Sequence, residues 1–95
     1  MLDEYFYIPR SIIKKSWYKD KYASHVFIHF LAKANQDGVF TTTLQELSSE
    51  LNISISAIKR AISKLKLSNE IKTKTDFKNI TFSILNYEKY SIDRA

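Results

Sequence analysis

The apolar residues of this chain recur at two different spacings, and each spacing predicts one kind of secondary structure. From about Asp20 to Ala34 they lie three and four residues apart, which is the repeat of a helix with one buried face. We therefore predict a helix over this stretch, ended by Asn35 and Gly38. Its inward stripe consists of Ala23, Val26, Phe27, Phe30, Leu31 and Ala34.

A second, shorter helix is predicted to begin at residues 43–46 (TLQE), which match a capping box. In such a box Thr43 caps the helix, and Glu46 reaches back to the Thr43 amide. The helix is expected to end at Asn52. Its inward positions are Leu44, Leu47 and Leu51.

A third helix follows after a turn of only about two residues. Ser54 is its predicted N-cap, Ile53 is a candidate hydrophobic staple, and Asn69 suits a left-handed end. Two helices joined so tightly are typical of the helix-turn-helix, whose second helix enters the major groove of DNA. The inward stripe of this helix consists of Ile58, Ala61, Ile62 and Leu65.

Short β-prone runs lie on either side of these two helices and predict strands at Val39 to Thr42, Ile71 to Thr75 and Ile80 to Leu85. Residues 76–79 separate the last two runs and suit a hairpin turn. The order of elements predicts an α+β, mainly α fold, the winged helix-turn-helix, with three helices and a β-hairpin wing.

The chain is long enough for one domain, residues 1–95, with an N-terminal arm and short helix at 1–19 and a core at 20–95. Tyr5 to Ile8 is aromatic and β-prone, which predicts an edge strand or an ordered arm. Two alternatives stay open for this arm. It joins a second copy in a homodimer, or it folds back against Tyr87 and Tyr90. The apolar residues expected on the following short helix or turn are Ile12, Ile13, Trp17 and Tyr18.

The net charge of +5 is concentrated in one part of the chain. Residues 52–81 hold seven cations and two acids, Glu70 and Asp76, whereas the rest of the chain holds eight of each sign. Localised basic charge indicates a polyanionic partner. The alternative is an ordinary solvated face. The seven cations are Lys59, Arg60, Lys64, Lys66, Lys72, Lys74 and Lys78.

We expect double-stranded DNA to be this partner, because the basic residues fall on the predicted third helix and hairpin. Arginine bonds guanine with two hydrogen bonds, serine bonds bases or phosphates, and helix N-termini offer free amides to phosphate. Ile55 lies among these residues and either meets a thymine methyl or packs on the second helix, which we favour. The candidate DNA-binding residues are Ser54, Ser56, Lys59, Arg60, Ser63, Lys64, Lys72, Lys74 and Lys78.

Other chemistries find little support in the sequence. There is no cysteine and only one glycine, which excludes disulfides and glycine-rich phosphate loops. His25 and His29 share a helix face, but no third metal ligand is evident. No catalytic constellation stands out, so we expect no enzyme and no cofactor. The aromatic residues are assigned to core and arm packing rather than base stacking, because they cluster outside the basic block.

The start of the chain has no signal-peptide pattern, and no run is long enough to span a membrane. We therefore expect a cytoplasmic protein with no membrane partner.

Several stretches resemble the N-terminal winged-helix domain of phage replisome organisers and DnaD-like replication initiation proteins. They are WYKD with the later KAN, and SNEIKTKT followed by ITFSILNYEKY. The resemblance spans about Ile8 to Tyr90, although the connection at 35–38 is shorter than usual in the family. It implies recognition of origin or operator DNA, assembly with replication proteins, and self-association through the arm and first helix. The family's C-terminal region for single strands or helicase loading lies outside it.

Two other functions compete with replication initiation in a phage or mobile element. A small transcriptional repressor would use the same DNA-binding chemistry. A protein-interaction module would use the fold as a scaffold and bind a replication or defence protein through the arm, Trp17, Tyr18 or Ile28. Ile28 favours this alternative because it lies off the inward stripe of its helix.

Overall fold

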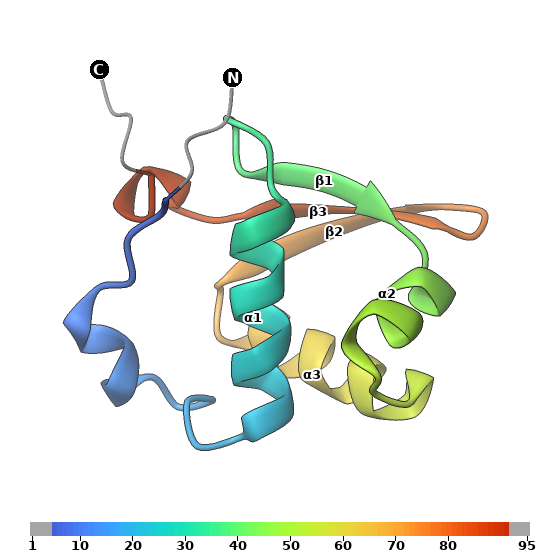
Figure 1. The fold of residues 1–95 in the computed structure, drawn as a ribbon, viewed down its shortest axis with the longest axis horizontal. Helices are drawn as coiled ribbons and strands as arrows, with labels where there is room; N and C mark the ends of the chain where they lie inside the picture. The colour runs from blue at the N-terminus through green and yellow to red at the C-terminus, as the bar shows by residue number, and fades with distance from the viewer. Residues whose placement is uncertain (1–4, 92–95) are drawn as a thin grey trace.

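The computed structural model describes residues 5–91, which form three α-helices and a three-stranded antiparallel sheet (Figure 1). The predicted α+β class is confirmed, and the layout is compatible with a winged helix. No helix within the described residues is both long and apolar enough to cross a membrane. The elements, with η for a 3-10 helix, are η1 (Arg10–Lys14), α1 (Lys21–Lys33), β1 (Val39–Thr42), α2 (Leu44–Leu51), α3 (Ile55–Leu67), β2 (Ile71–Asp76), β3 (Asn79–Ile84) and η2 (Tyr87–Lys89).

Side-chain caps decide where α1 and α3 begin. The Asp20 carboxylate accepts hydrogen bonds from the amides of Tyr22 and Ala23, and so satisfies two amides that have no partner within the helix. Ser54 accepts a hydrogen bond from the Ala57 amide at the start of α3, as predicted. Beyond the end of α3, Asn69 adopts the predicted left-handed backbone with φ 59°.

The capping box at the start of α2 forms only in part. Thr43 accepts the hydrogen bond of the Glu46 amide at 3.1 Å, as predicted. The Glu46 carboxylate, however, lies 3.5 Å from the Thr43 hydroxyl instead of bonding the Thr43 amide. Asn52 ends the helix in a left-handed conformation, and α3 begins three residues later at Ile55. The tight turn between the two helices is therefore confirmed.

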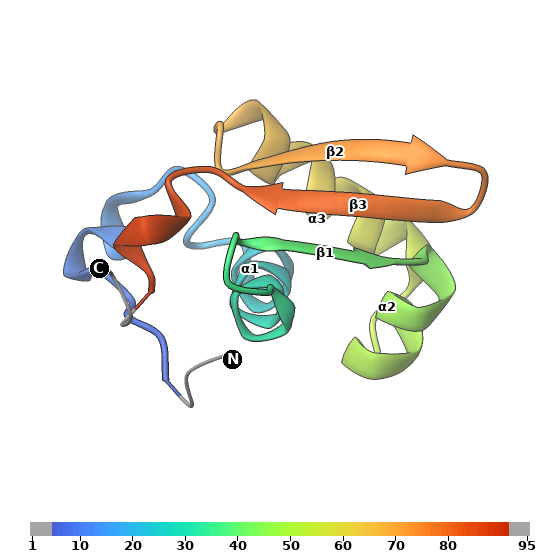
Figure 2. The same ribbon diagram turned by 90° about the horizontal axis from the view of Figure 1, so that it is seen from above.

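The strands form a sheet in the order β1-β3-β2, with β3 in the centre (Figure 2). The β2–β3 hairpin pairs from Ile71↔Ile84 to Asp76↔Asn79, so only Phe77 and Lys78 form its turn. We name these two residues the hairpin tip. The turn is shorter than the four residues predicted, because Asp76 and Asn79 extend the ladder by one pair.

The hydrophobic core fills the space between the sheet and the helices. All three α-helices lie on one side of the sheet, below it in Figure 1. The six residues of the predicted α1 stripe are all buried. Phe30 of α1 meets Phe82 of β3 with ring centroids 4.5 Å apart, which joins the helix layer to the sheet.

The N-terminal arm returns to its own domain. Phe6 forms an isolated antiparallel bridge with Ser91, and the Tyr7 amide donates a 2.7 Å hydrogen bond to the Tyr90 carbonyl. Phe6 also packs against the core. The arm is therefore an ordered arm and not a strand of the sheet, and it has the fold-back arrangement that was one of the two predicted alternatives.

Candidate nucleic-acid interface

The outer face of α3 carries the residues that were predicted to meet DNA. Ala57, Ile58, Ala61 and Leu65 are buried and Ile62 is half-buried against the core, so the polar positions of the helix turn toward solvent. Lys59 and Arg60 are exposed, and neither forms an ion pair with any described residue. A guanidinium and an ammonium with no internal partner are available to an external anion. The exposed members of the predicted set on α3 are Ser56, Lys59, Arg60, Ser63 and Lys64.

Lys64 differs from its neighbours because it has a partner within the domain. Its ammonium forms an ion pair with Asp20, the residue that caps α1. The hydrogen bond from Lys64, followed by that from the Ala23 amide, holds the pKa of Asp20 below its usual value. The predicted DNA contact at Lys64 is untested, and the structure shows in addition that Lys64 joins α3 to the start of α1.

The three lysines of the hairpin do not share one face of the sheet. Ile71 of β2 faces the core, and Thr73 is half-buried on the same side. Lys72 and Lys74 alternate with them and point to the face that the helices leave uncovered. Lys78 lies apart from both at the hairpin tip. The hairpin therefore presents cations on its outer face and at its end.

Glu70 was counted as one of the two acids of the basic block, but its side chain is buried. It is 5% exposed, and its carboxylate accepts a 3.1 Å hydrogen bond from the Trp17 indole and forms a 3.0 Å ion pair with Lys15. Lys64 is likewise paired. Of the seven cations of the block, the other six form no ion pair with an acid among residues 5–91, and Asp76 is the one exposed acid of the block.

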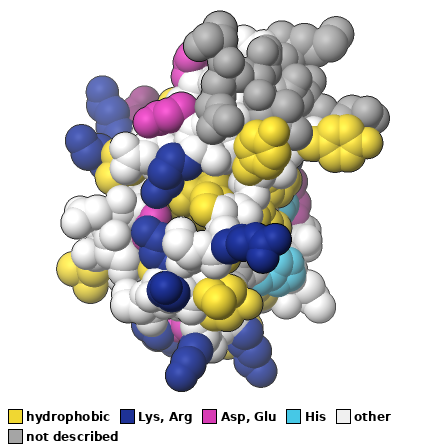
Figure 3. Space-filling model, turned by 90° about the vertical axis from the view of Figure 1, so that its left-hand side faces the viewer, with side chains coloured by type: hydrophobic (Ala, Val, Ile, Leu, Met, Phe, Trp, Pro, Cys, Tyr) yellow, Lys and Arg dark blue, Asp and Glu magenta, His cyan; other side chains and the backbone are white. Residues whose placement is uncertain are grey.

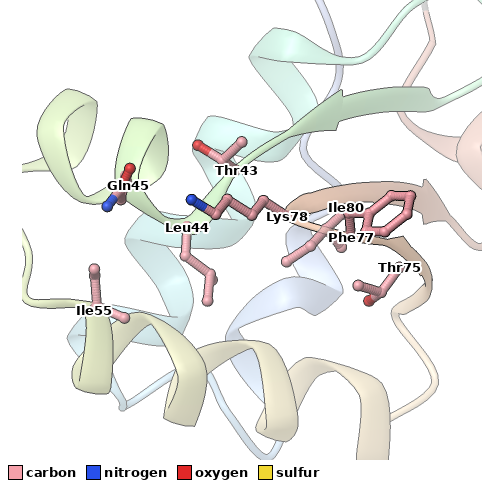
Figure 4. A pocket seen from close by; sticks show the side chains of 8 residues that line it. All are labelled: Thr43, Leu44, Gln45, Ile55, Thr75, Phe77, Lys78 and Ile80. Carbon is pink, nitrogen blue, oxygen red and sulfur yellow. The ribbon is translucent and has the colours of Figure 1, made fainter.

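A groove of about 410 Å³ separates the hairpin tip from the first turns of α2 and α3 (Figure 4). Lys78 extends across it toward α2, while Ile55 lies on its α3 wall. Ile55 is 37% exposed, so it packs only in part, and Leu44 of α2 shares the groove with it. The hairpin tip and the start of α3 both line this groove, so they lie at the same end of the molecule. Its lining residues are Thr43, Leu44, Gln45, Ile55, Thr75, Phe77, Lys78 and Ile80.

Phe77 is the residue that sequence reasoning missed. It is 96% exposed and adopts a left-handed backbone with φ 57°, which costs a residue with a Cβ about 1–2 kcal/mol. Phe77 lies between Lys74 and Lys78, so the prediction that aromatic residues lie outside the basic block is wrong for this residue. A phenylalanine in a tight turn, where glycine or asparagine is usual, was the available signal.

One of the two histidines of α1, His29, pairs with an acid of α2. His29 Nε2 lies 3.0 Å from Glu50 Oε1, and Lys33 contacts the other oxygen of that carboxylate at 3.3 Å. The hydrogen bond with His29, followed by that from Lys33, holds the pKa of Glu50 below its usual value. Among residues 5–91 no three side chains of the metal-binding types come together.

The surface around the arm offers other exposed hydrophobic residues. Tyr5 is 69% exposed and Ile13 is 61% exposed, whereas Trp17 is buried. Figure 3 shows hydrophobic side chains at several separate places on this side of the molecule, with Lys and Arg side chains between them. Ile28 is half-buried and packs against the core, so its position off the stripe does not indicate a free contact surface.

Comparisons of this chain with protein-family models, with curated proteins and with solved structures find no match. The resemblance to replisome organisers accordingly stays a prediction from the sequence.

Proposed function

We propose that this chain is a winged-helix domain that binds double-stranded DNA. The observation that carries the proposal is the outer face of α3, the helix that follows the tight helix–helix turn. There Lys59 and Arg60 are exposed and form no ion pair with any residue that the structure describes. In this arrangement α3 lies in the major groove, and the β2–β3 hairpin is the wing. The strand order β1-β3-β2 and the basic charge of the hairpin support the same assignment.

Each group has a distinct role in the proposed complex. Arg60 reads a base edge, most simply guanine O6 and N7, and Lys59 contacts DNA beside it. Ser56 and Ser63 bond bases or phosphates, and the first amides of α3, next to the Ser54 cap, face a phosphate. Lys72, Lys74 and Lys78 neutralise backbone phosphates.

Binding-site selection from random duplexes, followed by titration of the selected site, tests the role of α3. Arg60→Ala is expected to weaken binding to the selected site by about 1–3 kcal/mol and to relax specificity at one position. Lys14→Ala removes an exposed cation of η1 and is the matched control, with unchanged affinity expected. Equal affinity of Arg60→Ala and the unmodified chain for selected and random duplexes would exclude Arg60 as a reader.

The salt dependence of binding tests the wing separately. Substituting Lys72, Lys74 and Lys78 together by alanine should weaken binding to all sequences. It should also flatten the plot of log affinity against log salt by about 0.9 for each phosphate that the protein no longer neutralises. An unchanged slope would remove the hairpin from the interface.

The resemblance noted in the sequence supports replication initiation in a phage or mobile element as the process, with replication proteins as partners. A transcriptional repressor would bind DNA through the same face. The arm folds back but leaves Tyr5, Tyr7 and Ile8 exposed, so self-association as a homodimer stays a prediction that the fold-back does not settle. A homodimer would give paired half-sites in the selected DNA. Light scattering of the intact chain, and of a chain that lacks the first nine residues, tests it. A monomer mass for the intact chain would contradict it.

A further inference from the structure

The hairpin tip exposes the ring of Phe77, and this exposed ring does not contribute to the packing of the domain. Phe77 is 96% exposed, so its ring buries almost no surface within the described residues. Its left-handed φ of 57° is a conformation that phenylalanine rarely adopts and that asparagine or glycine adopts readily. Neither packing nor backbone conformation favours phenylalanine at this position. A backbone outlier of this kind is grounds for a hypothesis of function.

The tip is held firmly by the sheet behind it. Asp76 pairs with Asn79 directly beside the turn, and Ile80 pairs with both Thr75 of β2 and Thr42 of β1. Ile80 also packs against the core. The Phe77 ring therefore projects from a paired, three-stranded base rather than from a loose loop, and its position relative to α3 is set by the fold.

The charges around the ring favour DNA as the surface that it meets. Lys78 follows Phe77 in the tip, and Lys74 lies on the outer face of β2. Asp76 is the exposed acid nearby. In Figure 4 the ring points away from α2, whereas Lys78 extends toward it. The ring lies between Asp76 and Lys78 in the chain, three residues after Lys74. An apolar ring in this position can reach a base step while the Lys74 and Lys78 ammonium groups hold nearby phosphates.

We propose that Phe77 is an apolar wedge that enters the minor groove, inserts between adjacent base pairs and kinks the duplex. The proposal rests on the function proposed above, since it needs α3 in the neighbouring major groove. Unstacking is easiest at pyrimidine–purine steps such as TA and CA. Phe77 therefore adds a preference for such a step at a fixed distance from the bases that Arg60 reads.

The test measures the bend and the affinity together on one duplex. Energy transfer between dyes on the two ends of a selected duplex should rise when the intact chain binds, because a kink shortens the end-to-end distance. Phe77→Asn suits the left-handed backbone and should keep the fold. We expect it to abolish the rise in energy transfer and to lower the affinity about tenfold. Because the substitution removes no cation, the salt slope should stay the same.

Two further variants serve as controls. Phe77→Trp keeps a large ring and should keep the bend. Leu67→Ala removes another exposed apolar side chain, 83% exposed at the end of α3, and should change neither bend nor affinity.

The outcomes separate this proposal from the function on which it rests. If the duplex binds without bending, or if Phe77→Asn binds and bends it like the intact chain, the wedge is wrong and DNA binding stands. If the intact chain binds no duplex at low salt, both the wedge and the proposed function are wrong.

Discussion

The indole nitrogen of Trp17 donates a 3.1 Å hydrogen bond to the carboxylate of Glu70, which lies 53 positions later in the chain. Both side chains are buried, and Lys15 adds an ion pair to the same carboxylate oxygen. Glu70 immediately precedes β2, so these contacts fasten the segment before α1 to the base of the hairpin.

Glu70→Ala is therefore expected to destabilise the domain by about 2–4 kcal/mol, because it leaves the Trp17 donor and the partly buried Lys15 without their acceptor. Glu70→Gln keeps an acceptor for the indole and should cost less. Urea unfolding followed by the fluorescence of Trp17, the only tryptophan, measures both. Asp76→Ala, at an exposed acid, is the control. Equal losses for Glu70→Ala and Asp76→Ala would contradict the prediction.

Gly38 lies directly against Tyr87, in a position that only a residue without a Cβ fits. Its φ is +77°, and a Cβ built there would lie 2.5 Å from Cγ and 2.6 Å from Cβ of Tyr87. Gly38→Ala should therefore combine backbone strain with a steric clash and cost about 2–4 kcal/mol of unfolding free energy in urea titration.

A double-mutant cycle separates the two causes. Tyr87→Gly removes both Cγ and Cβ of Tyr87. Combining it with Gly38→Ala should therefore relieve the clash but leave the backbone strain at residue 38, so the two losses of unfolding free energy should not add. Strict additivity would show that the Tyr87 ring moves aside at little cost.

Local features of the sequence were enough to predict the elements. The caps at Ser54 and Asn69 and the stripe of α1 depend on residues within one or two turns of each other, and all three predictions are confirmed. The hairpin was predicted at the right place, but the predicted turn was too long. Asp76 and Asn79 pair because the β2–β3 ladder continues to them, which the turn residues alone do not show.

The electrostatic partners could not be predicted in the same way. Lys64 and Asp20 lie 44 positions apart, and only the packing of α3 against α1 brings them together. Charge counting along the chain could therefore show neither the partner of Lys64 nor the burial of Glu70, and the prediction that Lys64 contacts DNA stays a prediction. Phe77 was missed for a different reason, since assigning aromatic residues to the core as a class hid the one at the hairpin tip.

Because Lys64 is paired with Asp20, we expect its substitution to affect DNA binding differently from substitution of Lys59, which forms no ion pair with a described residue. Lys64→Ala should leave the salt slope of DNA binding unchanged, whereas Lys59→Ala should flatten it by about 0.9. Its effect should instead appear in stability, as a loss of less than about 1 kcal/mol for an exposed pair. Titration of both variants at three salt concentrations measures the slopes. A flattened slope for Lys64→Ala would contradict this prediction and show that Lys64 contacts a phosphate despite its ion pair.

Tyr90 predicts how the domain responds to alkali. The residue is 2% exposed, and burial, with a smaller contribution from the charge of Glu70, raises its pKa from 10.0 to about 12. Below pH 10 the hydroxyl is protonated in both folded and unfolded chains, so it has no effect on stability there. Between pH 10 and 12 the unfolded chain releases the proton first, and the free energy of unfolding falls as the pH rises.

The intact chain should therefore lose about 2 kcal/mol of unfolding free energy relative to Tyr90→Phe between pH 10 and pH 12. Urea unfolding followed by far-ultraviolet circular dichroism measures this difference without interference from tyrosinate fluorescence. Lysine deprotonation weakens the ion pairs of both chains alike, so it cancels in the comparison. Tyr5→Phe, at a tyrosine that is 69% exposed, should follow the intact chain throughout. Parallel pH curves for the intact chain and Tyr90→Phe would show that the Tyr90 hydroxyl ionises as readily in the folded domain as in the unfolded chain.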